Sequence, residues 1–148
     1  MTLLEMVARD RSELTDVILY DAERASPGYN FYSSRRQTGA RLIDMEGREL
    51  HAWNDEKAGA WQHVELLPDG SLIALVKDKR LTRYDKNSNR IWSVEGRFHH
   101  DLWVDGEEIY ALARVGRQVE FIHPRSPTLV DLIQVYSLEG GLLREISV

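Results

Sequence analysis

The chain has 148 residues, with 19 Lys and Arg against 24 Asp and Glu, which gives a formal net charge of −5. This length suits one domain with a real core, and the mild acidity argues against a nucleic-acid binder, which usually carries a basic surplus. No apolar run reaches the ~18 residues of a membrane span. The absence of Cys excludes disulfides, thiol catalysis and thiolate metal sites. We therefore expect neither nucleic acid nor membrane among the partners.

The first 26 residues differ in pattern from the rest. Eight apolar residues stand among charged ones at roughly helical spacing: Leu3, Leu4, Met6, Val7, Leu14, Val17, Ile18 and Leu19. This pattern predicts a short helical or irregular lead-in over residues 1–26, closed by turn residues at 26–28. Charged side chains also interrupt the apolar stretch that a signal peptide needs. The sequence as written predicts no signal peptide and, by default, a cytoplasmic protein.

From residue 27 to residue 148 the pattern is that of β-strands. Apolar runs of about 4–6 residues alternate with Gly, Asp or Asn, as in antiparallel strands joined by tight turns. The clearest runs are at 39–44, 49–53, 63–67, 72–76, 80–85 and 89–92. We therefore predict that residues 27–148 form an all-β domain.

The strands also repeat. A His followed after five residues by Asp-Gly begins at His63 and returns 36 residues later at His99. A strand that ends in Trp53 returns as one that ends in Trp92, and a weaker third copy covers 133–143. A period of ~40 residues with four short strands in each unit is typical of β-propeller blades. A β-sandwich whose hairpins look alike by chance is the alternative.

The third unit is interrupted by residues 114–130, which are longer than their counterpart at 77–80. This segment contains Pro124 and Pro127, which cannot lie in the middle of a sheet. The sequence therefore predicts a loop insertion here, either a protruding loop or an extra hairpin.

The β region amounts to about three four-stranded antiparallel blades, whereas propellers close with roughly 4–8 blades. Three blades alone would leave two sheet edges unpaired. We therefore expect a β-propeller portion that either belongs to a longer propeller or is closed by association of copies into a homo-oligomer.

The densest group of chemically capable side chains is His99, His100 and Asp101, at the start of the innermost strand of the third blade. Such strands line the channel of a propeller, and His63 holds the matching place one blade earlier. Imidazoles gathered there can act as nucleophile and as acid–base groups, and Arg114 could hold an anionic substrate. A packed or hydrogen-bonded role for the histidines is the structural alternative.

A metal site is a weaker interpretation of the same residues. Adjacent strand residues point to opposite faces, so a site would need His63, one of the two later histidines and a further carboxylate. We predict no metal and no cofactor. Of the other notable residues, His51 is expected to be structural, His123 lies in the Pro-containing loop, and Trp53 and Trp92 are expected to pack between blades.

Four stretches of the chain resemble the bacterial arylsulfotransferase family: residues 20–29, 40–53, 63–70 and the run His99-His100-Asp101. The resemblance extends over residues 17–112, and its most specific element is the His-His-Asp run after a strand that ends in Trp. It implies a six-bladed β-propeller that moves a sulfuryl group from a phenolic sulfate ester to a phenol, without a nucleotide sulfate donor, through a sulfated histidine in the central channel. Aryl sulfates and phenols would be the partners, and the location would be periplasmic or secreted.

By position, the resemblance makes His63, His99 and His100 channel histidines that bind and polarise the sulfuryl group. The histidine that becomes sulfated lies in a later blade of the family and has no counterpart here. We therefore expect an arylsulfotransferase-like β-propeller portion with little or no turnover from this chain alone. A non-catalytic β-propeller module that binds a ligand or a protein partner is the alternative.

Overall fold

The computed structural model describes residues 17, 19–34 and 38–147. These residues form eleven β-strands and no helix. The strands are β1 (Asn30–Ser33), β2 (Gly39–Ile43), β3 (Glu49–Asn54), β4 (Trp61–Leu66), β5 (Leu72–Val76), β6 (Arg80–Tyr84), β7 (Arg90–Glu95), β8 (Phe98–Asp105), β9 (Glu108–Arg117), β10 (Thr128–Ser137) and β11 (Leu142–Ser147). The all-β prediction is therefore confirmed.

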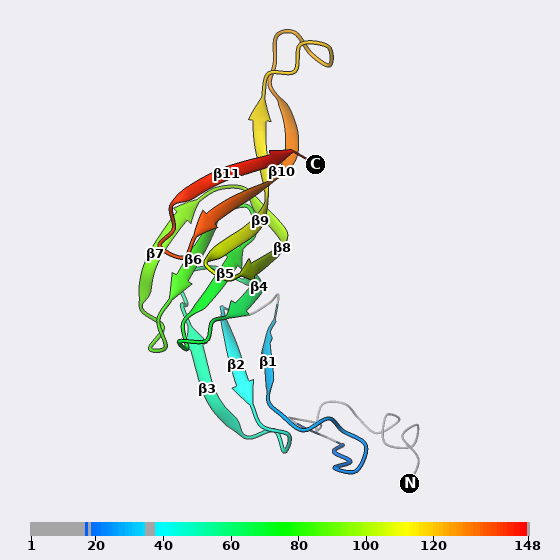
Figure 1. The fold of residues 1–148 in the computed structure, drawn as a ribbon, viewed down its shortest axis with the longest axis vertical. Coiled ribbons are helices and arrows are strands. Elements are labelled where there is room, and N and C mark those ends of the chain that lie inside the picture. Colours follow the sequence, from blue (N-terminus) through cyan, green and yellow to red (C-terminus); the bar gives the residue numbers. More distant parts are fainter. Residues whose placement is uncertain (1–16, 18, 35–37, 148) are drawn as a thin grey trace. The chain divides into compact units, whose positions relative to one another are not determined.

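The strands form three sheets in which neighbours in sequence are neighbours in space (Figure 1). The first sheet has the order β1-β2-β3, the second β4-β5-β6-β7 and the third β8-β9-β10-β11. Each pairing in the second and third sheets is antiparallel. Short turns between consecutive strands impose this order, because a tight turn brings the next strand back beside the previous one.

Two compact units make up the chain. One contains residues 1–31 and 41–52, and the other contains residues 32–40 and 53–148. The second and third sheets lie entirely in the latter unit. The candidate site described below therefore lies within this one unit.

Of the predicted lead-in over residues 1–26, residues 1–16 and 18 lie outside the described residues. The part that is described forms turns rather than helix, and the N–H of Ala25 donates to the carbonyl oxygen of Asp21 at 2.9 Å. No helix within the described residues is long and apolar enough to cross a membrane.

The burial of the strands follows their sequence patterns. All five residues of β5 are buried, as the unbroken run Leu-Ile-Ala-Leu-Val predicts for a strand covered on both faces. In β9, Ile109, Ala111 and Ala113 are buried while the residues between them are less so. This alternation indicates a strand that buries one face against a core and leaves the other face open.

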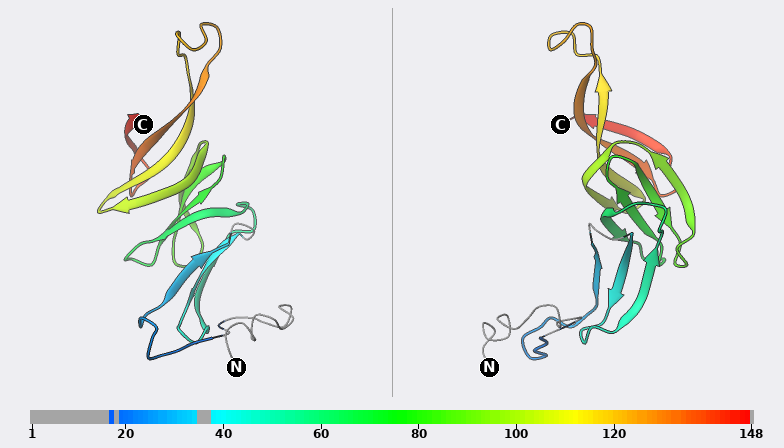
Figure 2. Two further views of the ribbon diagram at one scale, coloured as in Figure 1. Left: turned by 90° about the vertical axis from the view of Figure 1, so that its right-hand side faces the viewer. Right: turned by 180° about the vertical axis from the view of Figure 1, so that it is seen from behind.

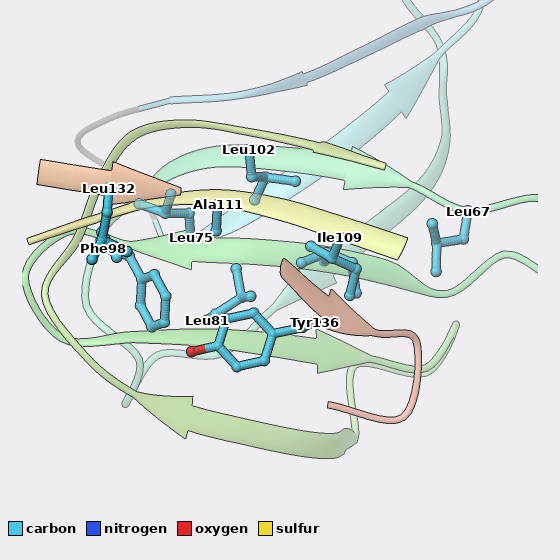
Figure 3. Packing of buried hydrophobic residues seen from close by; sticks show 11 residues of the cluster. Leu67, Leu75, Leu81, Phe98, Leu102, Ile109, Ala111, Leu132 and Tyr136 are labelled. Carbon is cyan, nitrogen blue, oxygen red and sulfur yellow. The ribbon is translucent and has the colours of Figure 1, made fainter. Parts of the chain in front are cut away.

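The core lies between the second and third sheets (Figure 3). Leu75 and Leu81 of the second sheet pack with Phe98, Ile109 and Leu132 of the third, and each is at most 1% exposed. Burying a side chain of this size contributes roughly 1.5–3 kcal/mol. The two sheets therefore stabilise each other face to face.

Two side chains of the second sheet fix this packing by bonding to the third. The indole N–H of Trp92 and the Nη1 of Arg83 both donate to the carbonyl oxygen of Leu138, at 2.7 Å and 2.9 Å. Trp92 is partly buried against the core and lies over Gly140, where an added Cβ would come within 2.8 Å of the indole ring. Trp92 thus packs between sheets, as the sequence predicted.

The strand pairing shows that the repeat spacing at this place is 37 residues, one more than the sequence motif indicated. Trp61 pairs with Val76, and Phe98 pairs with Ala113, so both partners are displaced by 37 residues (61 to 98, 76 to 113). The 36-residue spacing that matched His63 with His99 is therefore wrong by one, and His99 aligns with Gln62. A sequence motif could not reveal this, because the turn between β4 and β5 is longer than the turn between β8 and β9.

The predicted insertion at 114–130 is divided between strand and loop. β9 and β10 continue their pairing as far as Arg117 and Thr128, and residues 118–127 connect them. The two strands project beyond the rest of their sheet and carry this loop at the tip (Figure 2). Both prolines lie in the loop, where no ladder hydrogen bond is lost.

Candidate functional site

The innermost strand of the third sheet contains a bulge of three residues. Phe98 pairs with Ala113 and Leu102 pairs with Ala111, so His99, His100 and Asp101 together lie opposite Leu112 alone. Phe98 and Leu102 both face the core, and the chain between them has to leave the ladder. Extra residues in a bulge re-aim side chains, and here they present two imidazoles and a carboxylate together.

Strand β4 bulges at the aligned place. Trp61 pairs with Val76 and His63 with Leu75, which leaves Gln62 as the extra residue. The bulge in β4 is one residue shorter than the one in β8, because two residues separate Trp61 from Val64 and three separate Phe98 from Leu102. Both innermost strands therefore break their ladders where the predicted site residues lie.

The backbone of His100 adopts a left-handed conformation, with φ of 62°. This region costs a non-Gly residue energy, and outliers of this kind cluster at functional sites. The strained conformation lets His99 remain buried, at 5% exposed, while His100 is exposed. Their Nδ1 atoms lie 2.7 Å apart, and the two rings are perpendicular.

Asp131 of β10 lies beside the buried member of the pair. Its Oδ1 is 3.3 Å from the Nε2 of His99, a close approach that lies off the direction of a well-aligned hydrogen bond. The same carboxylate accepts two hydrogen bonds from Arg114, at 2.7 Å and 3.1 Å. The pairing of Asp131 with Arg114 across β9 and β10 fixes this contact. The Arg114 guanidinium lowers the pKa of Asp131 from its usual value.

The short contact between the two Nδ1 atoms requires one ring to donate and the other to accept. Where the Nδ1–H of His100 donates, the Nε2 of His100 keeps its lone pair and the proton of His99 lies on its Nε2, on the side of Asp131. The resulting order, carboxylate then imidazole then imidazole, is that of an oriented base and an activated nucleophile.

His63 reaches the same bulge from the second sheet but makes different contacts. Its Nδ1 lies 3.0 Å from the Oδ1 of Asp101, and its Nε2 lies 3.4 Å from the Oε1 of Glu65. Asp101 also accepts from the backbone N–H of Leu102 at 3.0 Å. Both ring nitrogens of His63 therefore face carboxylates, so His63 holds Asp101 rather than an anionic ligand.

The predicted site residues thus lie around one bulge, where they contact two carboxylates. His99 and Arg114 meet at Asp131, His100 contacts His99, and His63 meets Asp101. Asp131 could not be identified from the sequence, because its position opposite Arg114 depends on where the chain turns back after β9. The predicted anion-binding charge of Arg114 is already matched by Asp131. Among the described residues, no group of three or more potential ligands comes together to hold a metal ion.

A hollow of about 430 Å³ adjoins the bulge on the face of the third sheet that points away from the core. We call this the open face. Its lining is mostly apolar: Asp101, Leu102, Trp103, Tyr110, Leu112, Ile133 and Ile146. The rings of Trp103 and Tyr110 lie 5.4 Å apart, and Trp103 is 57% exposed. An apolar floor with the carboxylate of Asp101 at its margin can accept an aromatic group or another apolar surface.

A scan against protein-family models finds no match for this chain, and a search of curated proteins finds none either. The resemblance to arylsulfotransferases therefore stays a prediction. Any function has to be argued from the site itself.

Proposed function

We propose that this chain is a β-propeller portion whose histidine bulge takes part in sulfuryl transfer from an aryl sulfate to a phenol. The observation that carries the proposal is the series Asp131, His99 and His100, in which consecutive side chains lie 3.3 Å and 2.7 Å apart. With His100 donating to His99, the exposed ring of His100 keeps a free lone pair at Nε2, and Asp101 of the same bulge lines an apolar hollow. The proposal takes the three sheets as blades, two of them with the predicted four strands and the first with three.

In the first step the Nε2 of His100 attacks sulfur and the bond between sulfur and the aryl oxygen breaks. The aryl group leaves as phenolate, and the positive charge on the His100 ring is relieved when its Nδ1 proton moves to His99. Asp131 then stabilises the imidazolium of His99. In the second step the oxygen of an acceptor phenol attacks sulfur and the N–S bond breaks as His99 returns its proton to the Nδ1 of His100. The phenol proton passes through the histidine pair to solvent, where it balances the phenolate released in the first step. In this proposal Asp131 is a positioning residue and His100 is the nucleophile, a role that the family resemblance places in a later blade.

The charges around the bulge limit this chemistry. Glu65, Asp101 and Asp131 oppose a single arginine, Arg114, so the described residues offer little net positive charge to a sulfuryl group. The cationic donors that stabilise its oxygens have to come from elsewhere, which agrees with the expectation of little or no turnover by the chain alone. Covalent labelling of one histidine is therefore a more sensitive measurement than turnover.

We expect incubation with 4-nitrophenyl sulfate to place one sulfuryl group on His100, detected by mass spectrometry of the intact chain and of its peptides at alkaline pH. The substitution His100→Ala should abolish the label, and Asp131→Asn should slow labelling by ~10²-fold or more. The matched control is His123→Ala, because His123 is an exposed histidine in the loop outside the bulge. An unlabelled wild-type chain, or a label that survives His100→Ala, would refute the proposal.

A second candidate function is that of a non-catalytic propeller module that binds a partner. It is favoured by the exposed apolar side chains of the open face, Trp103 and Ile146 among them. The labelling experiment distinguishes the two candidates, because a pure binding module would leave His100 unmodified.

A further inference from the structure

The turn between β5 and β6 gathers positive charge beside a hollow of about 380 Å³. Three cationic side chains follow β5 closely, Lys77, Lys79 and Arg80, against the single carboxylate of Asp78. The hollow, which we call the lysine pocket, is lined by Ala60, Gln62, Val76, Lys77 and Lys79. These residues belong to one compact unit, and none of them lines the hollow of the open face.

Neither lysine of the pocket has a carboxylate to neutralise it. Within the described part of the chain, no Asp or Glu oxygen lies within 4.0 Å of the ammonium group of Lys77 or Lys79. The charge of Asp78 acts on another residue, because Asp131 and, more weakly, Asp78 raise the pKa of Arg114. Two cations that line one hollow without a counter-ion repel each other, and an anion bound between them relieves that repulsion.

Gln62 adds a neutral donor to the lysine pocket. Its Oε1 is buried and has no hydrogen-bond partner among the described residues, so the accessible atom of this part-buried amide is the Nε2. That nitrogen can only donate. The three polar side chains of the pocket therefore all offer donors, two of them charged, and such donors suit the oxygens of an anion.

The backbone on both sides of the lysine pocket is fixed by hydrogen bonds. The Nη2 of Arg80 donates to the carbonyl oxygen of Ala58 at 2.9 Å, which holds the segment that leads to Ala60. The N–H of Asp78 donates to the carbonyl oxygen of Phe98 at 2.8 Å, which holds the turn against the third sheet. A ligand then has to order only the lysine side chains, which keeps the entropic cost of binding low.

The aligned places in the third sheet contain an anion of their own. Val76 pairs with Arg80 as Ala113 pairs with Leu132, so the shift between the sheets is 37 residues for the inner strands (76 to 113) and 52 for the next strand (80 to 132). These shifts match three residues of the lysine pocket with three of the histidine site: Gln62 with His99, Lys77 with Arg114 and Lys79 with Asp131. In the third sheet the aspartate neutralises the arginine, whereas the second sheet has a second cation in its place. The second sheet thus keeps the cation and lacks the internal anion, which a ligand can supply.

We propose that the lysine pocket binds a tetrahedral oxyanion, namely a sulfate or phosphate group that is either free or esterified. Lys77 and Lys79 neutralise its charge, and the Nε2 of Gln62 donates to a further oxygen. Ala60 and Val76 form an apolar wall, beside which an organic group attached to the anion can lie. Binding requires no chemistry at His100, so this proposal and that of sulfuryl transfer can fail separately.

Nuclear magnetic resonance of the full chain, labelled with nitrogen-15, tests the site by titration with inorganic sulfate, inorganic phosphate and 4-nitrophenyl phosphate. The ionic strength is held constant with chloride, so that a general response to salt does not appear as binding. We expect saturable shifts of the backbone amides of Gln62 and of residues 77–79 at millimolar concentrations. The probe that binds most tightly shows whether a free ion or an ester is preferred. The same shifts should appear in His100→Ala.

Substitutions in the pocket test the assignment of the donors. Lys77→Gln and Lys79→Gln should each raise the dissociation constant at least ~5-fold, and Gln62→Glu, which replaces the amide by a carboxylate of similar shape, at least ~10-fold. The matched control is Lys86→Gln, which removes the same charge from the turn between β6 and β7 and should change the constant less than about twofold. Circular dichroism checks that each variant keeps its sheets.

Three results would overturn the proposal. The first is the absence of saturable shifts at these amides in the wild type up to about 50 mM of every probe. The second is a double variant Lys77→Gln, Lys79→Gln that is folded and binds as tightly as the wild type. The third is a loss of affinity in Lys86→Gln as large as that in Lys77→Gln, which would mean that net charge attracts the anion without a site.

Discussion

Tyr84 illustrates how single buried polar groups hold this fold. The ring is 0% exposed and stacks on Trp61 with ring centroids 4.9 Å apart. Its hydroxyl donates to the Oδ2 of Asp55 at 2.8 Å, and the Nε of Arg90 donates to the same oxygen at 2.7 Å. Burial, together with the hydrogen bond to Asp55, raises the pKa of Tyr84 to about 12.

This raised pKa predicts a loss of stability at alkaline pH. The unfolded chain ionises Tyr84 near pH 10, whereas the folded chain keeps it neutral until about pH 12. The contribution of Tyr84 is therefore complete below pH 10 and is lost as the pH rises to about 12, by roughly 2–3 kcal/mol. Urea unfolding between pH 8 and pH 12 measures this loss of free energy of unfolding. In Tyr84→Phe the free energy of unfolding should fall less over the same pH range. The exposed Tyr29 provides the control Tyr29→Phe, which should leave the curve unchanged. Parallel curves for the wild type and Tyr84→Phe would contradict the assignment.

His100 has a left-handed backbone conformation that is unfavourable for a residue other than glycine. We expect His100→Gly to keep the free energy of unfolding or raise it by up to about 1 kcal/mol, because glycine enters the left-handed region without steric cost. His100→Val should lower it by about 1–2 kcal/mol. Thermal unfolding of the two variants checks both values. A large destabilisation by His100→Gly would mean that the histidine pair stabilises the fold rather than serving chemistry.

At the scale of the elements, the turns repeat as regularly as the strands do. In four turns the carbonyl of the first residue accepts from the N–H of the fourth residue, which has positive φ: Gly47 (88°), Gly70 (79°), Ser88 (68°) and Gly140 (86°). A left-handed residue at this place closes the turn. Only at Gly140 does the missing side chain also make room for a side chain of another sheet, the indole of Trp92.

Gly140→Ala should therefore lower the free energy of unfolding more than the same substitution at an ordinary turn glycine does. The backbone penalty is about 1 kcal/mol, and the clash with Trp92 adds about 1–3 kcal/mol. Gly106→Ala is the matched control, since Gly106 also has positive φ (58°) but nothing within 4 Å of an added Cβ. Chemical denaturation of both variants should separate the two costs. Equal losses would show that the contact between Gly140 and Trp92 does not fix the sheets.

At the scale of the whole molecule, the shared core makes the second and third sheets cooperative. Neither sheet can keep its buried face away from water alone, because the core takes residues from both. We expect these two sheets to unfold in one transition, with coincident changes in tryptophan fluorescence and far-ultraviolet circular dichroism.

Leu132→Ala should lower the free energy of unfolding by about 2–5 kcal/mol without changing the denaturant slope. Leu132 is 1% exposed in β10, whereas Leu129 on the same strand is 53% exposed, so Leu129→Ala should have an effect below about 0.5 kcal/mol. Separate transitions for the two probes would mean that the sheets are held by their bonds to Leu138 rather than by the core.

The sequence by itself determined the class of the fold and most of its elements. Alternating apolar residues and turn residues at short intervals are local signals, and they predicted an all-β chain, most of its strands from Gly39 onward and the packing role of Trp92. The run of His99 and His100 was also visible, because adjacent residues need no fold to bring them together.

The tertiary structure alone decided how these residues meet. Asp131 reaches His99 only because β9 and β10 extend to ten residues each before the loop at 118–127, and this length sets the register. The bulge that turns His100 outward arises because Phe98 and Leu102 both enter the core, a constraint between sheets that no local pattern carries. Register, bulges and facing surfaces depend on contacts between segments far apart in the chain, and these contacts form only when the sheets pack.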